Sequence, residues 1–189
     1  MNRPVAVLLA AGGGTRFRGS THKLLAPLRG KPVYRWAIDH ALEAGCEVWI
    51  VTGAADLPRQ DVRAGHPITF LHNPDWATGQ ASSLQCAVTE ARRRGLDAFT
   101  VGLADQPFIS PSTWIAVSAC DSPIAVANYG GKRGNPVRLS SAVWDLLPTE
   151  GDAGARNLMV QRPDLVADVS CDGSNADIDT QEDLEQWNS

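Results

Sequence analysis

The stretch LLAAGGGTRFRGSTHKLL, residues 8–25, decides the fold, because it joins an apolar run to three glycines, two arginines and a lysine. The run that leads into it, Val5 to Leu9, is apolar throughout and rich in β-branched residues, as in a strand covered on both faces of an α/β sheet. The glycines at 12–14 let the backbone approach a ligand closely, and stacked amides there bind phosphate. Arg16 and Lys23 add positive charge. The stretch predicts a buried strand that ends in an anion-binding loop.

Strands and helices alternate along the rest of the chain. Further strands are expected at residues 47–53, 68–73, 98–107, twice within 123–139, and at 165–170. Helices are expected from Pro32 to Gly45, at 82–95, from Pro111 onward, at 140–147, at 153–162 and at 180–187, where Thr180 is the N-cap and Asp183 takes the capping-box position. This alternation predicts a single α/β domain over residues 1–189, a three-layer sandwich with a Rossmann-like, mostly parallel sheet. Ligands bind such sheets beyond the carboxyl ends of the strands.

Composition favours small-molecule chemistry. The chain has 17 lysines and arginines against 21 acidic residues, a net charge of −4, which is unlike a nucleic-acid-binding protein. It shows neither a signal-peptide pattern nor an apolar run of the roughly 18 residues that a membrane span needs, so we expect a cytoplasmic protein without a membrane partner. The four cysteines form no C-x-x-C pair, and we expect them to be reduced and mostly packed.

Two familiar phosphate-binding loops do not fit residues 12–23. A dinucleotide fingerprint, G-x-G-x-x-G, needs a glycine where this chain has Phe17. A Walker A loop needs a lysine directly after its second glycine. Gly14 and Gly19 have the correct separation, but Ser20 stands at the lysine position.

The same stretch resembles the LxAGGxxxRMGxxK signature of the nucleotidyltransferase superfamily, which includes the molybdenum cofactor cytidylyl- and guanylyltransferases and the sugar-phosphate nucleotidylyltransferases. Gly19 and Lys23 fall on its glycine and lysine, and Phe17 replaces the methionine of many members. The resemblance implies a sheet of the nucleotidyltransferase type and a triphosphate held by the loop. Arg16 and Lys23 would then neutralise phosphate oxygens.

Five further motifs are similar to the MocA-like branch of that superfamily and extend the resemblance over nearly the whole chain. They are HNPDWATGQASSLQCAV (72–88), LADQPFIS (103–110), GGKRGNPVRLS (130–140), GDAGAR (151–156) and DIDTQEDL (177–184). The branch commonly has histidine where this chain has Asn135. That departure leaves the acceptor open, and Asn135-Pro136 can also be read as a tight turn. The sequence Ala10-Ala11-Gly12 resembles the cytidylyl enzymes and favours CTP over GTP.

The resemblance also implies site residues. Those for nucleotide binding are Leu9, Ala10, Ala11, Gly12, Gly13, Gly14, Lys23, Asn73, Gly79, Ser82, Ser83 and Asp105. Those for catalysis are Arg16, Lys23 and Asp105. Ser82 and Ser83 can also be polar residues at a helix start, and Trp76 can either contact the nucleoside or pack at the rim. Trp36, Trp49, Trp114 and Trp144 lie in apolar segments and are expected in the core or an interface.

Asp105 is also indicated by its position, because it follows a buried strand, where α/β folds bring divalent ions and phosphates together. Magnesium binds one or two carboxylates together with substrate phosphate oxygens. We expect Asp105 and Asp177 to hold Mg²⁺, with Mn²⁺ as the alternative metal. Asp179 is the alternative second ligand, but it can also simply lead into the capped final helix.

The resemblance implies transfer of CMP from CTP to the phosphate of molybdenum cofactor, with release of pyrophosphate and hand-over to a xanthine-dehydrogenase-type enzyme. Three alternatives remain. One is a guanylyl- or other nucleotidylyltransferase that acts on a different phosphorylated small molecule. Another is a protein that binds nucleotide or molybdenum cofactor without catalysis. The third is a Rossmann oxidoreductase, in which Asp39 would be the acid that binds ribose.

Overall fold

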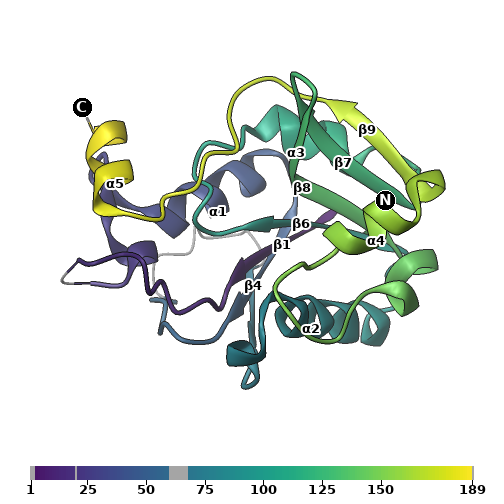
Figure 1. Cartoon of the computed structure of the whole chain (residues 1–189), viewed down its shortest axis with the longest axis horizontal. Helices are drawn as coiled ribbons and strands as arrows, with labels where there is room; N and C mark the ends of the chain where they lie inside the picture. The colour runs from purple at the N-terminus through teal and green to yellow at the C-terminus, as the bar shows by residue number, and fades with distance from the viewer. Residues whose placement is uncertain (1–2, 20, 60–67, 189) are drawn as a thin grey trace.

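The computed structural model describes residues 3–19, 21–59 and 68–188, and its centre is a seven-stranded sheet in the order β5-β4-β1-β6-β8-β7-β9 (Figure 1). The strands of this sheet are β1 (Val5–Ala10), β4 (Glu47–Thr52), β5 (Ile68–His72), β6 (Ala98–Leu103), β7 (Ile124–Tyr129), β8 (Lys132–Ser140) and β9 (Val166–Ser170). All neighbouring strands pair in parallel except β8, which runs antiparallel to β6 and β7. The sheet is therefore mostly parallel, as the sequence predicts.

The central strand β1 is apolar throughout because helices cover both of its faces. Successive side chains of a strand point to opposite faces. Ala6 and Leu8 pack with α1 (Val33–Glu43) and α3 (Pro111–Ser118), while Val5 and Val7 pack on the other face with α2 (Gln80–Arg93) and α4 (Arg156–Gln161). The two helical layers enclose the sheet and form the three-layer sandwich that the alternating pattern predicts (Figure 1).

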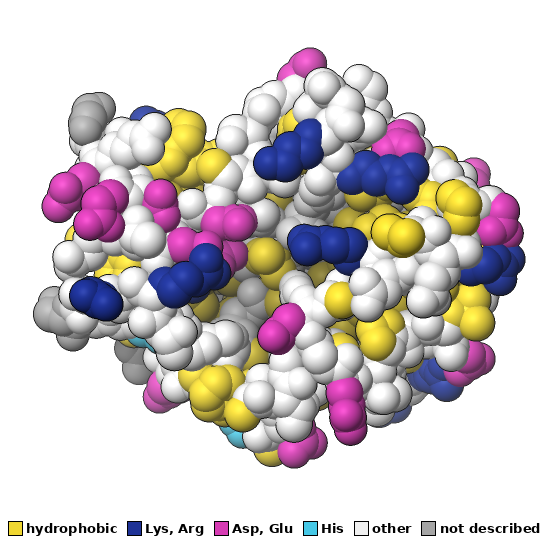
Figure 2. Space-filling view, viewed as in Figure 1, with side chains coloured by type: hydrophobic (Ala, Val, Ile, Leu, Met, Phe, Trp, Pro, Cys, Tyr) yellow, Lys and Arg dark blue, Asp and Glu magenta, His cyan; other side chains and the backbone are white. Residues whose placement is uncertain are grey.

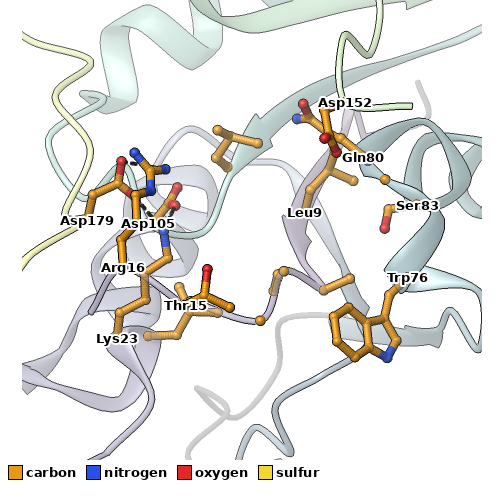
Figure 3. A pocket seen from close by; sticks show the side chains of 18 of the residues that line it. Leu9, Thr15, Arg16, Lys23, Trp76, Gln80, Ser83, Asp105, Asp152 and Asp179 are labelled. Atoms are coloured by element: carbon orange, nitrogen blue, oxygen red, sulfur yellow. Dashed lines mark hydrogen bonds and ion pairs between the residues drawn. The ribbon is translucent and has the colours of Figure 1, made fainter. Parts of the chain in front are cut away.

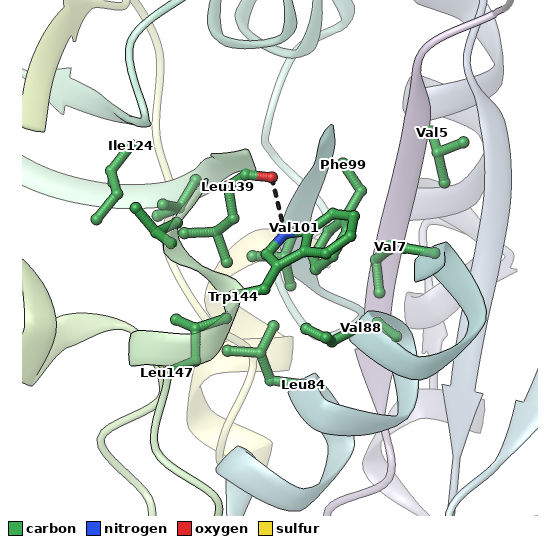
Figure 4. Close-up of a cluster of buried hydrophobic side chains, with 14 of the residues drawn as sticks. Val5, Val7, Leu84, Val88, Phe99, Val101, Ile124, Leu139, Trp144 and Leu147 are labelled. Carbon is green, nitrogen blue, oxygen red and sulfur yellow. Dashed lines mark hydrogen bonds between the residues drawn. The ribbon is translucent and has the colours of Figure 1, made fainter. Parts of the chain in front are cut away.

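The larger core cluster lies between β6, β8 and α2 (Figure 4). Phe99 and Trp144 stack with ring centroids 5.6 Å apart, and the indole Nε1 of Trp144 donates to the carbonyl oxygen of Leu139 at 3.2 Å. Trp49 and Trp114 are fully buried as well. Three of the four tryptophans assigned to the core thus lie there, and Trp36 lies half-buried in a peripheral cluster.

The end of the chain packs beside the site. A small hairpin, β2 (Pro27–Leu28) with β3 (Lys31–Pro32), contacts α5 (Gln181–Asn188). The rings of Phe108 and Trp187 lie 4.0 Å apart between centroids, and the amide of Arg29 donates to Asn188 Oδ1 at 2.6 Å. The segment between β9 and α5 has to cross the sheet to reach this position, and it brings residues 175–179 to the carboxyl end of β6 (Figure 1).

Most expected element positions are confirmed. Helix α2 begins at Gln80, two residues before its expected start, and the segment 141–146 forms a 3₁₀ helix, η3 (Ser141–Leu146). The capping box of α5 is present, because the amide of Thr180 donates to Asp183 Oδ2 and the amide of Asp183 donates to Thr180 Oγ1. The hairpin β2-β3 and the 3₁₀ turns η1 (Lys23–Leu25), η2 (Trp76–Thr78) and η4 (Pro163–Leu165) were not expected.

Two further expectations can be compared with the described residues. All four cysteines are free; Cys46 is buried and the other three are half-buried. Over the described ranges, the helices are all too short or too polar to cross a membrane.

Candidate nucleotide and metal site

A cavity of about 440 Å³ opens beyond the carboxyl ends of β1 and β6 (Figure 3). Its lining residues are Leu9, Ala10, Ala11, Gly12, Gly13, Gly14, Thr15, Arg16, Lys23, Leu24, Trp76, Ala77, Gly79, Gln80, Ser83, Leu103, Asp105, Asp152 and Asp179. The charged group of Lys23, Asp105 and Asp179 lies at one end, and Gln80 and Asp152 lie at the other, with the glycine loop between them (Figure 3). Most of the residues predicted for nucleotide binding thus line one cavity.

The glycine loop leaves β1 and turns along the floor of this cavity. Its entry is fixed to both neighbouring strand ends, because Leu9 O accepts from Ala104 N and Ala11 O accepts from Ala54 N, each at 3.0 Å. Gly14 has a φ of +60°, a conformation that favours glycine. Ser20, where the Walker A comparison fails, lies outside the described residues.

Two cations and two carboxylates form an ion cluster at one end of the cavity. Lys23 Nζ lies 2.5 Å from Asp105 Oδ2 and 2.7 Å from Asp179 Oδ1, and an Arg16 guanidinium nitrogen lies 2.9 Å from Asp179 Oδ2. Burial by itself would lower the pKa of Lys23, but the charges and hydrogen bonds of Asp105 and Asp179 outweigh it and raise that pKa above its usual 10.5. Lys23 therefore stays charged at neutral pH.

Asp105 has the property expected of a metal ligand. Its Oδ2 is paired with Lys23, whereas its Oδ1 is buried and has no hydrogen-bond partner among the described residues. A buried carboxylate oxygen without a partner is costly, and a cation would satisfy it. The described residues contain no cluster of three or more acidic, histidine or cysteine side chains that could hold a metal. Mg²⁺ binds one or two carboxylates and takes its other ligands from phosphate and water, so the unpartnered Asp105 Oδ1 fits it.

The two candidates for the second metal ligand have different surroundings. Asp179 is the one bound to Lys23 and Arg16, and it lines the same cavity as Asp105. Asp177 lines an adjacent cavity, where its Oδ1 accepts from Gln106 Nε2 at 2.5 Å. Burial, and then the negative charge of Asp105, raise the pKa of Asp177. Asp179 thus forms ion pairs with Lys23 and Arg16, whereas Asp177 forms none within the described residues, although the charge of Lys23 also acts on it.

The adjacent cavity measures about 670 Å³ and shares the lining residues Leu9, Gln80 and Leu103 with the first, so the two are direct neighbours. Its other lining residues are Leu84, Val101, Gln106, Val126, Lys132, Arg133, Gly134, Asn135, Val137, Ala153, Gly154, Ala155, Arg156, Met159, Val160, Asn175, Ala176 and Asp177. Figure 2 shows a hollow in this face with lysine and arginine side chains around it. Arg133 is paired with Asp168 at 2.6 Å, whereas Lys132 and Arg156 form no ion pair within the described part of the chain.

Asn73 and Ser82 do not line the first cavity. They belong to a hydrogen-bond network behind Ser83, which does line it. Asn73 is buried, and its Nδ2 donates to Ser82 Oγ at 2.9 Å and to Ser83 Oγ at 3.0 Å, while its Oδ1 accepts from the amide of Asp75. This links the end of β5 to the start of α2 and places Ser83 at the cavity surface. Their direct contact with nucleotide stays a prediction.

Gly79 and the GDAGAR motif form one wall together. The amide of Ala81 donates to Gly151 O at 2.9 Å, and the amide of Gly151 donates to Thr78 O at 3.1 Å. Gly79 has a φ of +113°, and a Cβ on it would lie 2.6 Å from the carbonyl carbon of Gly151. A side chain at position 79 would therefore push the two segments apart.

Trp76 is half-buried at the edge of the cavity (Figure 3). A Cβ added to Gly53 would lie 2.6 Å from Trp76 Cβ, and one added to Gly13 would lie 3.4 Å from the indole ring. The ring therefore packs against the glycine loop at the rim of the cavity, and its contact with the nucleoside stays a prediction.

Several lining residues were not predicted from the sequence. Gln80 and Asp152 carry polar groups, and Asp152 Oδ1 accepts from the amide of Gln80 at 3.3 Å. Both lie inside motifs that resemble the family, and the single acidic residue of GDAGAR is the sequence signal that marks Asp152. Thr15 and Leu24 flank predicted residues, whereas nothing in the local pattern marks Leu103 or Ala77.

Comparisons with known proteins agree with this fold. The model of the MobA-like NTP transferase domain family matches residues 6–166. The chain is 31% identical over 192 residues to the nicotine blue oxidoreductase of Paenarthrobacter nicotinovorans, a match that covers 94% of this chain and 93% of that protein.

Solved structures share the architecture. Rv0371c from Mycobacterium tuberculosis H37Rv superposes with a TM-score of 0.81 and 26% identity over 99% of this chain and 98% of its own. A second structure of that protein, in complex with manganese, gives a TM-score of 0.74 and 25% identity over 98% of each chain. CMP:2-keto-3-deoxy-manno-octonic acid synthetase, solved with CTP, has a TM-score of 0.71 at 17% identity over 99% of this chain and 97% of its own, and shows the fold alone.

The family model spans most of the chain, and the nucleotidyltransferase fold places a glycine loop and an acidic residue at the carboxyl ends of β1 and β6. The chain therefore belongs to the MobA-like NTP transferase domain family.

Proposed function

We propose that this nucleotidyltransferase-family protein transfers CMP from CTP to the phosphate group of molybdenum cofactor and releases pyrophosphate. The observation that carries the proposal is the cavity in which a glycine loop, two cations and the unpartnered Asp105 Oδ1 lie together. Backbone amides and cations bind a triphosphate, and a free carboxylate oxygen binds the metal that accompanies it.

In the proposed reaction an oxygen of the acceptor phosphate forms a bond to the α-phosphorus of CTP, and the bond from that phosphorus to the bridging β-phosphate oxygen breaks. The electron pair leaves with pyrophosphate, and the acceptor, already an anion, needs no strong base. Such reactions are catalysed mainly by positioning and charge neutralisation. Amides of residues 12–14 would orient the triphosphate, and Arg16 and Lys23 would neutralise its β- and γ-phosphates.

Lys23 can make that contact from its present position. An ammonium group has three N–H donors, and two of them point to Asp105 and Asp179. The third is available for a phosphate oxygen. Asp179 would hold both cations of the loop in place, since it contacts Lys23 and Arg16 at once.

Asp105 and Asp177 would hold Mg²⁺ or Mn²⁺. A bound metal ion would withdraw charge from the phosphate oxygens. The choice of Asp177 as the second ligand is supported by its electrostatic interaction with Asp105 and by the absence of a direct ion pair to it within the described residues. A manganese complex of a structural neighbour supports use of a divalent metal.

CTP is supported by Ala10-Ala11-Gly12, which resembles the cytidylyl enzymes. The larger cavity would take the acceptor, because it adjoins the first one and carries Lys132 and Arg156, which form no ion pair with any described residue and could bind an anionic group. A molybdenum hydroxylase of the xanthine-dehydrogenase type would be the recipient of the product. The alternative acceptors, other phosphorylated small molecules, fit the same chemistry.

A second candidate function is that of an oxidoreductase acting on nicotine blue or a similar compound, favoured by the 31% identity to nicotine blue oxidoreductase over nearly the whole chain. The cavity with the glycine loop and the ion cluster supports the transferase instead. Hydride transfer does not require an ion cluster with an unpartnered carboxylate oxygen. Consumption of NADH or NADPH, measured with nicotine blue as the electron acceptor, distinguishes the two functions.

The proposal is tested by mass spectrometry of the product formed from CTP and molybdenum cofactor with Mg²⁺. A product that is one CMP unit heavier than the cofactor supports it. Hydride transfer without any nucleotide adduct would replace it with the second candidate.

A further inference from the structure

We infer that Gln106 is a positioning residue that ties the metal-binding carboxylate of Asp177 to Asn135 in the acceptor cavity, an inference that rests on the proposed function. Gln106 follows Asp105 directly and is only 4% exposed. It touches neither the ion cluster nor the first cavity. Its side chain instead connects three segments that are far apart in the sequence.

The carboxamide of Gln106 uses both its donor hydrogens and its acceptor oxygen. Nε2 donates to the carbonyl oxygen of Asn175 at 3.0 Å and to Asp177 Oδ1 at 2.5 Å, while Oε1 accepts from Asn135 Nδ2 at 2.9 Å. A carbonyl and an ionised carboxylate can only accept, so the partners fix which end of the amide is which. Neither glutamate nor an apolar side chain of the same length could make this set of bonds.

The backbone holds the same arrangement from both sides. The amide of Ile178 donates to the carbonyl oxygen of Asp105 at 2.9 Å, which pins the segment before α5 to the end of β6. Tyr129 Oη donates to the carbonyl oxygen of Asn135 at 2.7 Å, which anchors β8 at that residue. Gln106 thus lies between two anchored segments and orients one side chain of each, Asp177 and Asn135.

This network has a consequence for Asp177. One of its oxygens is held by Gln106, which leaves the other for the proposed metal ion. Residues that orient a metal ligand by a hydrogen bond commonly change metal affinity by 10- to 100-fold when they are removed. On the opposite side the same amide fixes Asn135, the position where the MocA-like branch commonly has histidine. Gln106 therefore couples the metal ligand to the acceptor side of the site.

The test is the variant Gln106→Met, which keeps the length and loses all three hydrogen bonds. Gln85→Met is its matched control, because Gln85 Nε2 also donates to two carbonyl oxygens, those of Leu147 and Pro148, but lies outside both cavities. Mn²⁺ is titrated into each protein with a non-transferable α,β-methylene analogue of CTP, and free Mn²⁺ is followed by electron paramagnetic resonance. We expect about a tenfold or greater loss of Mn²⁺ affinity in Q106M and none in Q85M.

The outcomes separate this inference from the proposed function. Tight Mn²⁺ binding by the wild-type protein and by Q106M alike would overturn the role of Gln106 and leave the transferase proposal intact. No Mn²⁺ binding by the wild-type protein would overturn both. An equal loss in Q106M and Q85M would show a general structural effect and would also overturn the inference.

A double-mutant cycle tests the other half of the network without metal. The melting-temperature changes of Gln106→Met and Asn135→Ala should be non-additive, because each removes the same hydrogen bond, while those of Gln85→Met and Asn135→Ala should add. Additive changes in the first pair would contradict the coupling. If Q106M does not fold, Asn135→Ala replaces it in the Mn²⁺ titration. A several-fold loss of affinity is then expected, and unchanged affinity would overturn the inference.

Discussion

Lys23 Nζ lies 2.5 Å from Asp105 Oδ2, while the other oxygen of the same carboxylate is buried without a hydrogen-bond partner among the described residues. The two oxygens of one side chain are thus in opposite states. One neutralises the lysine of the glycine loop, and the other is left for a second cation. Asp105 can therefore join the triphosphate site to a metal.

Asp105→Asn should abolish nucleotidyl transfer and leave the fold intact. The amide removes the negative charge that a divalent ion requires, but it has the same shape. We expect at least a 100-fold loss of turnover, the upper end of the range for perturbed metal sites, with a melting temperature close to that of the wild type. Steady-state kinetics and thermal unfolding check this, and an active, folded variant would refute the metal assignment.

Lys23→Ala should weaken binding of CTP much more than binding of CMP. The ammonium is proposed to meet the β- and γ-phosphates, which CMP lacks. A hydrogen bond to a charged group contributes about 1.5–3 kcal/mol, so a loss of about 10- to 100-fold in CTP affinity is expected. Calorimetric titration with both nucleotides measures it. Equal losses for CTP and CMP would place Lys23 away from the outer phosphates.

Two glycine substitutions should affect different properties, one the stability of the fold and the other the affinity for CTP. A Cβ on Gly12 would meet nothing within 4 Å, whereas one on Gly53 would lie 2.6 Å from Trp76 Cβ and 2.8 Å from Ala11 Cβ. Gly53→Ala should therefore lower stability by about 1–3 kcal/mol, the usual cost of overpacking. Gly12→Ala should leave the melting temperature unchanged and weaken CTP binding, since the methyl group would enter the triphosphate cradle. Chemical denaturation and CTP titration of both variants test this pair. A destabilised Gly12→Ala variant together with a stable Gly53→Ala variant would contradict the position of the loop.

Glu90→Gln should lower stability at pH 7, and this loss should shrink as the pH falls toward 2 and disappear below it. Hydrogen bonds from Arg93 lead the causes that lower the pKa of Glu90 from 4.5 to about 2, and Arg94 adds to them. Because the folded-state pKa is depressed, the stabilisation is complete above the unfolded pKa and is lost as the pH falls through about 2. Exposed ion pairs contribute about 0.5–1 kcal/mol. Urea unfolding at several pH values measures the difference, and a constant difference between pH 7 and pH 2 would be inconsistent with this linkage.

Much of the fold could be predicted from the sequence because local patterns report burial. The apolar run at residues 5–9 indicates a strand covered on both faces, and Gly45, with a φ of +80°, ends the preceding helix region as its position suggests. The hairpin β2-β3 was missed because its two strands have two residues each, too few for any periodicity. The 3₁₀ helix at 141–146 was expected only as a short helix, since its apolar spacing does not distinguish the two forms.

The individual residues of the candidate site could be predicted from the sequence, but the contacts between their side chains could not. The glycine loop, Lys23 and Asp105 follow strands whose ends must meet at one edge of the sheet. The bonds from Lys23 to Asp105 and Asp179 span 82 and 156 residues of sequence, and no local pattern contains them. The network of Gln106 is hidden for the same reason. A buried amide gains its role from partners that only the tertiary fold supplies.

The most direct test of the account is pyrophosphate release by the purified protein with Mg²⁺ and molybdenum cofactor, measured with each of the four nucleoside triphosphates and with Asp105→Asn as the control. The account predicts release with CTP alone, dependent on the acceptor and absent in the variant. Release that is equal with all four triphosphates, or that persists in Asp105→Asn, would contradict it.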